Sequence, residues 1–300
     1  MITGVLSGFL AAFLNAVAFL FSARFLKKYN SSRHLLVSAH IVMLCLCLPA
    51  ALFLYPGKIV DLPRYLFYIA AWVVVFFSGQ FSFFTALKHI EASRLSSLLG
   101  LKLIVLTVIF MITARTFPGI WQWLAIIIAA AAAVMINWSG DGKVNFKGGI
   151  FLLLTLICYS FSDICETGMA KCMLDSGHSE LRGAFFATSV AYVALGSAIL
   201  PGLFKVKITR AQLVTVFPYS CLWVVSQAFL MIGFAKVGPV FGNVILSSRG
   251  LFSVVLGAIL VLFTDSKLDA DIPFLQWIRR GIAAILMISA IALYSWASRG

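Results

Sequence analysis

Residues 86–136 read ALKHIEASRLSSLLGLKLIVLTVIFMITARTFPGIWQWLAIIIAAAAAVMI, a stretch that is mainly apolar after its first ten residues. It contains two long apolar runs, 94–113 and 119–138, which meet at Pro118 and Gly119. A helix of about 20 apolar residues is long enough to cross the hydrocarbon core of a bilayer. Proline and glycine commonly mark the ends of such segments. The stretch therefore predicts two consecutive membrane-spanning helices.

The same pattern extends over the whole chain. Of its 300 residues, 62% are hydrophobic and 11% are charged, and the mean hydropathy is +1.04. Soluble domains contain about 45–50% apolar and about 25% charged residues, so this composition excludes a soluble enzyme. Helices fit the apolar runs, because open sheet edges cannot face hydrocarbon. We expect an all-α membrane protein with ten transmembrane helices, at 2–22, 34–54, 65–86, 94–113, 119–138, 148–170, 182–203, 213–235, 241–263 and 276–296.

The sequence also repeats itself after 147 residues. This offset places Gln80 on Gln227 and Lys102 on Arg249, and a seven-residue insertion in the last loop then aligns Gln122-Trp123 with Gln276-Trp277. We therefore predict two halves, 1–140 and 148–300, whose boundary lies around 139–149. Each half holds five spans, so the second half enters the membrane in the opposite orientation. Inverted repeats around a central cavity are typical of transporters.

The charge is strongly positive, and it bears on topology. The chain has 23 Lys and Arg against 10 Asp and Glu, a formal net charge of +13. Most of these cations flank apolar runs, where they meet phospholipid headgroups, so no nucleic-acid partner is expected. The loops after spans 1, 3, 5, 7 and 9, together with the span ends beside them, hold 14 Lys and Arg, against 7 on the other side counted in the same way. This asymmetry favours both termini outside the cytoplasm.

Two cations inside apolar spans are the first candidates for a substrate site. Lys102 lies in the fourth predicted span and Arg249 in the ninth, at equivalent positions of the two halves. A Lys or Arg at the bilayer centre costs about 2.5–3.5 kcal/mol on insertion scales, and such residues face a water-filled cavity or an opposite charge. Alternatively, Lys102 and Arg249 form structural ion pairs, or their side chains extend to the lipid headgroups.

Carboxylates and amides supply the remaining candidates. Asp163 and Glu166 are three residues apart in span 6 and share a helix face, so either one pairs with a cation or couples protons. Gln80 and Gln227 form a second symmetric pair, whose amides need hydrogen-bond partners inside the membrane. Contacts between helices are the alternative role for these amides. Other polar or aromatic candidates for the cavity are Tyr159, Asn15, Asn243 and Trp223.

Residues 86–136 resemble the closing segment of a drug/metabolite transporter repeat of the EamA type. Residues 233–263, GFAKVGPVFGNVILSSRGLFSVVLGAILVLF, resemble the same segment more loosely. With ten spans in two halves, the resemblance covers essentially the whole chain. It implies a carrier of small metabolites with a cavity between the halves, lined mainly by spans 1, 3, 4, 6, 8 and 9. It also implies cytoplasmic termini, in conflict with the loop charges.

Three hypotheses for function follow. The first is secondary active transport of a small polar metabolite, an amino acid or other organic anion, by alternating access, coupled to a proton or a counter-substrate. The second is export of amphipathic or cationic compounds, in which Asp163 and Glu166 matter most. The third is a flippase for a phosphorylated lipid carrier, or a membrane scaffold. No catalytic motif, metal site or cofactor site is present in the sequence, so we do not expect an enzyme. The short loops favour a bacterial inner membrane, and a monomer or a homodimer both fit.

Overall fold

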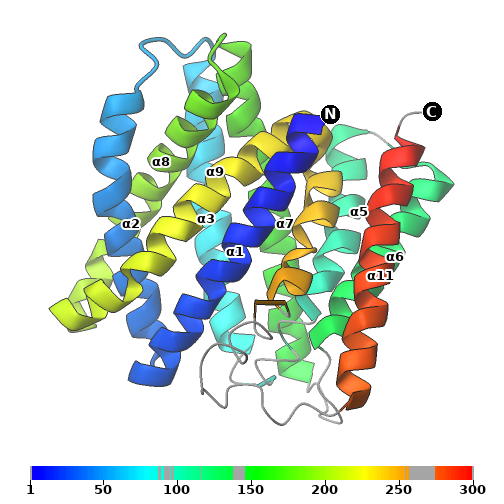
Figure 1. Cartoon of the computed structure of the whole chain (residues 1–300). Helices are drawn as coiled ribbons and strands as arrows, with labels where there is room; N and C mark the ends of the chain where they lie inside the picture. The colour runs from blue at the N-terminus through cyan, green and yellow to red at the C-terminus, as the bar shows by residue number, and fades with distance from the viewer. Residues whose placement is uncertain are drawn as a thin grey trace. The chain divides into compact units, whose positions relative to one another are not determined.

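The computed structural model of the chain describes residues 2–86, 89–90, 95, 98–115, 117–137, 146–253, 255–256 and 274–298. Within these ranges the protein is all-α (Figure 1). The described residues form seven helices that are long and apolar enough to cross a membrane, and two shorter apolar helices. Large apolar side chains such as Phe53, Ile120 and Ile285 are exposed on helix surfaces, as expected where lipid replaces water. The prediction of an all-α membrane protein is confirmed.

The elements follow one another with short connections. The first three helices are α1 (Ile2–Tyr29), α2 (Ser32–Leu54) and α3 (Leu62–Ala86), and each agrees with a predicted span. The 3-10 helix η1 (Leu99–Leu101) leads directly into α5 (Lys102–Ala114). The remaining elements are α6 (Ile120–Asn137), α7 (Phe146–Asp175), α8 (Glu180–Ile199), the 3-10 helix η2 (Leu200–Phe204), α9 (Arg210–Leu246) and α11 (Phe274–Ala297).

Helix α9 consists of two helices joined at a kink. Gly238 has φ 79° and ψ 162°, which is not a helical conformation, and Pro239 follows it. A positive φ is readily adopted only by glycine. The apolar segment Arg210–Ser253 has 44 residues, far more than the roughly 20 that one crossing needs. The kink thus separates the predicted spans 213–235 and 241–263, and the described residues contain the ten expected helical segments.

Some helix ends differ from the predictions. Helix α7 continues to Asp175, whereas the predicted span ended at 170, so Asp163 and Glu166 lie well inside a helix and not at its end. Lys102 is the first residue of α5, directly after a 3-10 turn, and not a residue deep within a continuous α-helix. The predicted boundary between the halves lies largely outside the described residues, as does the end of the span 241–263.

The chain divides into two compact units, and each takes helices from both predicted halves. Unit 1 comprises the described parts of Met1–Phe77 and Ser162–Gly238. Its helices α2 and α8 pack side by side (Figure 1). The unit also contains α1, the part of α9 before the kink, the first part of α3 and the second part of α7. Its interior is filled by large aromatic and apolar side chains that are almost completely buried: Phe25, Met43, Tyr65, Trp72, Tyr192 and Phe234.

Unit 2 comprises the described parts of Ser78–Phe161 and Pro239–Gly300. Helices α6 and α11 pack against each other, with an edge-to-face pair of Trp121 and Trp296 at one end. The beginning of α7 packs against the end of α3 and the region of η1, and the buried side chains there are Ala86, Ile90, Leu95, Leu152 and Leu156.

Small residues bring the helices of unit 1 close together. A Cβ atom added at Gly196 of α8 would lie 2.7 Å from Leu44 Cβ and 3.1 Å from the His40 carbonyl of α2. A Cβ at Gly4 of α1 would lie 2.6 Å from Lys236 Cβ of α9. In a bilayer, where helices gain little from hydrophobic burial against one another, such close packing supplies much of the association energy. The glycines are therefore structural contact points.

We expect Gly196→Ala to destabilise the protein. The new methyl group clashes with the backbone and Cβ of α2, and overpacking of this kind costs about 1–3 kcal/mol. Gly281→Ala in α11 is the matched control, because a Cβ there meets nothing within 4 Å and alanine favours the helix. Thermal unfolding of the detergent-solubilised protein measures both. A melting temperature of Gly196→Ala equal to or above that of Gly281→Ala would contradict the packing described.

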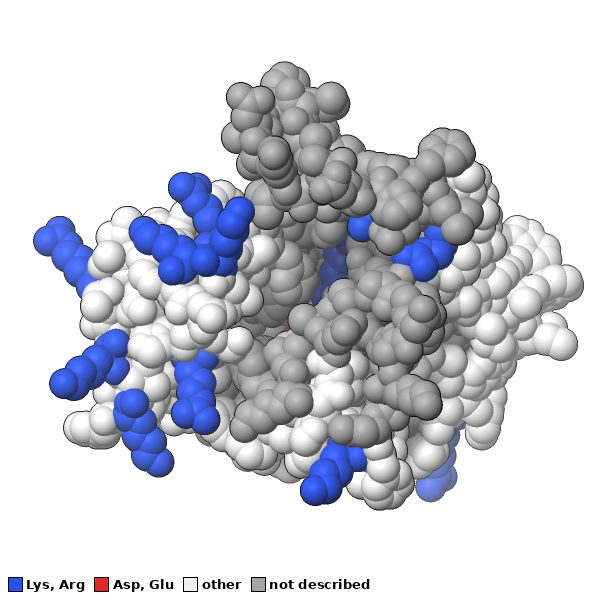
Figure 2. Space-filling model, turned by 90° about the horizontal axis from the view of Figure 1, so that it is seen from below, with Lys and Arg blue, Asp and Glu red and all other residues white. Residues whose placement is uncertain are grey.

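One end of unit 1 is strongly basic. It consists of the end of α1, the start of α2, η2 and the start of α9, and segments 24–33 and 200–210 contain no Asp or Glu. Figure 2, which views the molecule from this end, shows Lys and Arg side chains projecting from it. The opposite end of the unit carries the acids Asp61, Asp175 and Glu180 among its cations. The cations of the basic end are Arg24, Lys27, Lys28, Arg33, Lys205, Lys207 and Arg210.

We expect the basic end to face the cytosol, because cytosolic loops carry the excess of Lys and Arg. In a variant without its six native cysteines, Lys58→Cys at the opposite end should react with a membrane-impermeant maleimide on intact cells. Lys207→Cys should react only after the membrane is permeabilised. The reverse labelling pattern would show that the loop charges do not set the orientation and would support the cytoplasmic termini implied by the resemblance.

Candidate functional site

Unit 1 contains a cluster of aromatic side chains around a buried carboxylate. Glu166 of α7 is 3% exposed, and the indole Nε1 of Trp72 in α3 donates a hydrogen bond of 2.8 Å to its Oε1. Trp72 is itself completely buried, and it stacks on Phe76 one turn later with ring centroids 4.7 Å apart. A hydrogen bond to a carboxylate is stronger than one between neutral groups. The indole therefore fixes the position of the Glu166 side chain.

The cluster continues through Tyr192 of α8 to α9 and α1. The Tyr192 ring lies edge-on to Trp72 with centroids 5.4 Å apart, and its hydroxyl accepts a hydrogen bond of 2.6 Å from Trp223 Nε1. The Trp223 ring in turn meets Phe19 of α1 edge-to-face at 5.8 Å. Five helices thus meet through one run of aromatic and polar contacts. We call Glu166, Trp72, Tyr192 and Trp223 the aromatic–carboxylate cluster.

A second polar contact joins α1 and α9. Asn15, 1% exposed, donates from Nδ2 to Ser226 Oγ at 3.4 Å, and Ser226 Oγ donates to the Ala11 carbonyl at 2.8 Å. Asn15 Oδ1 is buried and has no hydrogen-bond partner among the described residues. A buried acceptor without a partner costs about 1–3 kcal/mol, so this oxygen is suited to a donor from water or a bound molecule. Gln227, the next residue in α9, is also buried.

In unit 2, the two candidate cations follow equivalent breaks in their helices. Lys102 is the first residue of α5, after the 3-10 helix η1 (Leu99–Leu101). In the second half, residues 247–248 form a turn and the helix resumes at Arg249. Ser248 N donates to the Ile245 carbonyl and Gly250 N to the Ser247 carbonyl. Each of these bonds spans three residues, as in a 3-10 turn. Both cations are half-buried. The two breaks are related by the 147-residue offset of the sequence repeat.

Other predicted residues of unit 2 make local contacts. Asn243 is buried, and its Nδ2 donates to the Pro239 carbonyl at 2.8 Å, one turn earlier, next to the kink of α9. Gln80 in α3 is half-buried and follows Gly79, where an added Cβ would lie 2.8 Å from the ring of Tyr159 in α7. Tyr159 therefore packs closely on α3 beside Gln80. These contacts fix the positions of the Asn243 and Tyr159 side chains.

The structure brings some predicted site residues together and adds others. Glu166 joins Trp223 through Trp72 and Tyr192, and Asn15 contacts α9 one residue before Gln227. Asp163 is 5% exposed on α7, one turn before Glu166. Tyr192 was not among the predicted site residues, because a single tyrosine in an apolar span carries no pattern in the sequence. Within the described ranges, no group of three or more His, Cys, Asp and Glu side chains could hold a metal ion.

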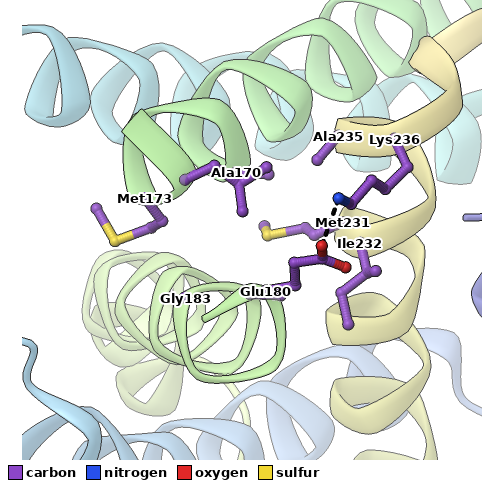
Figure 3. A pocket seen from close by; sticks show the side chains of 10 residues that line it. Ala170, Met173, Glu180, Gly183, Met231, Ile232, Ala235 and Lys236 are labelled. Atoms are coloured by element: carbon purple, nitrogen blue, oxygen red, sulfur yellow. Dashed lines mark ion pairs between the residues drawn. The ribbon is translucent and has the colours of Figure 1, made fainter. Parts of the chain in front are cut away.

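A small space near the other end of unit 1 is too small for a metabolite. It has a volume of about 10 Å³, and its lining includes Met173 of α7, Gly183 of α8 and Met231 of α9 (Figure 3). This is room for about one water molecule. An ion pair between Glu180 at the start of α8 and Lys236 of α9 borders it. Since Gly238 follows two residues after Lys236, the ion pair fixes α9 to α8 just before the kink.

We expect Trp72→Phe to lower the free energy of unfolding by about 1.5–3 kcal/mol, because the buried Glu166 carboxylate loses the charge-assisted hydrogen bond. Trp121→Phe is the control, since Trp121 is 52% exposed on α6 and contacts only the edge of Trp296 among the aromatic rings described. Chemical or thermal unfolding in detergent measures both variants. Equal losses of stability in the two would contradict a special role for the Trp72–Glu166 bond.

Comparisons with known proteins agree with this architecture. Residues 2–138 match the EamA-like transporter family. One solved crystal structure has a TM-score of 0.70 and 15% sequence identity, and the match covers 99% of this chain and 97% of the other. At this identity the likeness establishes a shared fold over the full length. No curated protein sequence matches the chain. The family match over residues 2–138 and the apolar helices together indicate a multi-pass membrane transporter of the drug/metabolite transporter type, whose first part is similar to the EamA-like family.

Proposed function

We propose that the protein is a secondary transporter that moves a small polar metabolite with an anionic group, such as an amino acid or another organic anion, by alternating access. The observation that carries this proposal is the position of Lys102 and Arg249. Each is the first helical residue after a 3-10 turn, at the same position of the two sequence halves. Broken helices in transporters supply ligand sites, because the break leaves backbone groups to bind substrate or ions.

The chemistry of the two side chains suits an anion. A guanidinium binds a carboxylate or phosphate through two parallel hydrogen bonds, and an ammonium adds a compact positive charge. A cation in an apolar span is costly unless an opposite charge or water accompanies it. Asp163 and Glu166 are the candidates for proton coupling in this scheme. The division of the chain into units supports the predicted inverted repeat of 1–140 and 148–300, because the equivalent spans 2 and 7 lie in one unit and the equivalent pairs 4 and 9, and 5 and 10, lie in the other. Spans 3 and 6 are divided between the units.

The aromatic–carboxylate cluster favours one competing function, export of a cationic or amphipathic compound. Organic cations bind over the faces of Trp and Tyr, and a carboxylate completes the neutralisation of their charge. Glu166, Trp72, Tyr192 and Trp223 provide these groups in unit 1. In this alternative the residues of the cluster bind the substrate, and Lys102 and Arg249 have a structural role.

A ligand screen followed by substitution tests the two functions against each other. Purified protein is first screened by thermal shift against amino acids, dicarboxylates, sugar phosphates and aromatic amines, because a ligand that binds only the folded state stabilises it. We expect stabilisation by an anionic or zwitterionic compound. We further expect Lys102→Gln and Arg249→Gln each to weaken its binding at least about tenfold, which is the loss of one charge-assisted hydrogen bond.

Lys171→Gln, at an exposed lysine of α7, is the matched control and should bind the ligand normally. Uptake of the same compound into vesicles then tests transport directly. The opposite result is stabilisation by aromatic amines alone, with the effect lost in Glu166→Gln and kept in Lys102→Gln and Arg249→Gln. That result would reject the anion proposal and establish the alternative.

A further inference from the structure

Unit 1 has an open groove at the outer surface of α2, α8 and α9. It has a volume of about 690 Å³, within the usual range for sites that hold a small molecule. Phe53 of α2 is 85% exposed and Leu181 of α8 is 55% exposed, so the groove opens toward the bilayer and not toward the interior of the unit. Its main lining residues are Phe53, Leu54, Leu181, Arg182, Phe185 and Phe229.

The walls of the groove are mainly apolar. Phe185 of α8 and Phe229 of α9 lie edge-to-face with ring centroids 5.9 Å apart and an interplanar angle of 85°. Leu181 and Phe185 are four residues apart on α8, so they lie on one face and form a continuous apolar strip. A polar metabolite would lose its hydration along these walls without gaining hydrogen bonds. A hydrocarbon chain fits them.

Arg182 places one positive charge at the end of this apolar strip. It lies in the first turn of α8, where a span begins and headgroups are expected. Its Nε donates to the Leu54 carbonyl at 3.3 Å and its Nη2 to the Tyr55 carbonyl at 3.0 Å, at the end of α2. These two bonds hold the guanidinium in place and use two of its five N–H donors. The neighbouring acid, Glu180, forms an ion pair with Lys236, so its charge does not oppose an anion here.

We propose that this groove binds one phospholipid, with the phosphodiester on Arg182 and an acyl chain along Leu181, Phe185 and Phe229. The charge and the apolar walls together complement an amphiphile with an anionic head, and the bilayer supplies that molecule at this depth. A guanidinium is the side chain best suited to a phosphate, through its planar fork of donors. The bound lipid would tie α2, α8 and α9 together at this end of unit 1. This inference is independent of the transported substrate.

Native mass spectrometry after purification in a mild detergent with added phosphatidylglycerol tests the proposal. The unmodified protein should carry one phospholipid, and the occupancy should fall about tenfold in Arg182→Gln, the effect of losing a charge-assisted hydrogen bond. Lys171→Gln removes an exposed cation of α7 outside the groove and should retain the lipid. Absence of the lipid from the unmodified protein, or its full retention in Arg182→Gln, would overturn the proposal.

A second variant keeps the test valid if Arg182→Gln does not fold, since Arg182 also binds the end of α2. Phe53→Gln combined with Leu181→Gln changes two exposed side chains and leaves the hydrogen bonds of Arg182 intact. The lipid occupancy should again fall, because the acyl chain loses its apolar contacts. In vesicles, phosphatidylglycerol with a photoreactive acyl chain should crosslink to Phe185 or Phe229. Unchanged occupancy in the double variant, or crosslinks confined to other helices, would overturn the proposal.

Discussion

A helix that crosses hydrocarbon must satisfy its own backbone hydrogen bonds, because no water is present to do so. This chain interrupts its α-helices at η1 before Lys102, at residues 247–248 before Arg249 and at Gly238. Each interruption carries a local compensation. The 3-10 turns keep short-range backbone bonds, and the Asn243 amide donates to the Pro239 carbonyl beside the kink. The breaks therefore persist within the apolar spans, and the positions of Lys102 and Arg249 depend on two of them.

The polar groups of unit 1 follow the same constraint by a different route. Glu166 is far from any helix end, and its buried carboxylate accepts a hydrogen bond from Trp72. In the same way, the Tyr192 hydroxyl accepts a hydrogen bond from the indole Nε1 of Trp223. Asn15 Oδ1, by contrast, is buried and accepts no hydrogen bond from a described residue. A transporter needs a few polar groups whose partner arrives only with the ligand or with water, and Asn15 fits that description.

The fold was largely predictable from the sequence, and the site was predictable only in part. Runs of about 20 apolar residues separated by glycine and proline indicate the helices directly. Gly238-Pro239 marked the separation of two spans that are otherwise continuous in α9. The 3-10 turns before Lys102 and Arg249 had no such mark, because leucine, glycine and serine occur there in an otherwise regular apolar pattern. The partners of Glu166 were equally hidden. In lipid both faces of a helix are apolar, so periodicity does not show which side faces the interior.

The symmetry of the two breaks is the strongest link between sequence and proposed function. The 147-residue offset rests on a few identities between the two halves of the sequence. In the structure the same offset relates Leu101 to Ser248, the last residues of the two turns, and Lys102 to Arg249, the first helical residues after them. A crystal structure of the protein with its transported ligand bound would test the proposed anion site directly. It should place an anionic group of the ligand within hydrogen-bond distance, about 3 Å, of both Lys102 Nζ and the Arg249 guanidinium. Both cations lying on lipid headgroups, with the ligand held elsewhere, would contradict it.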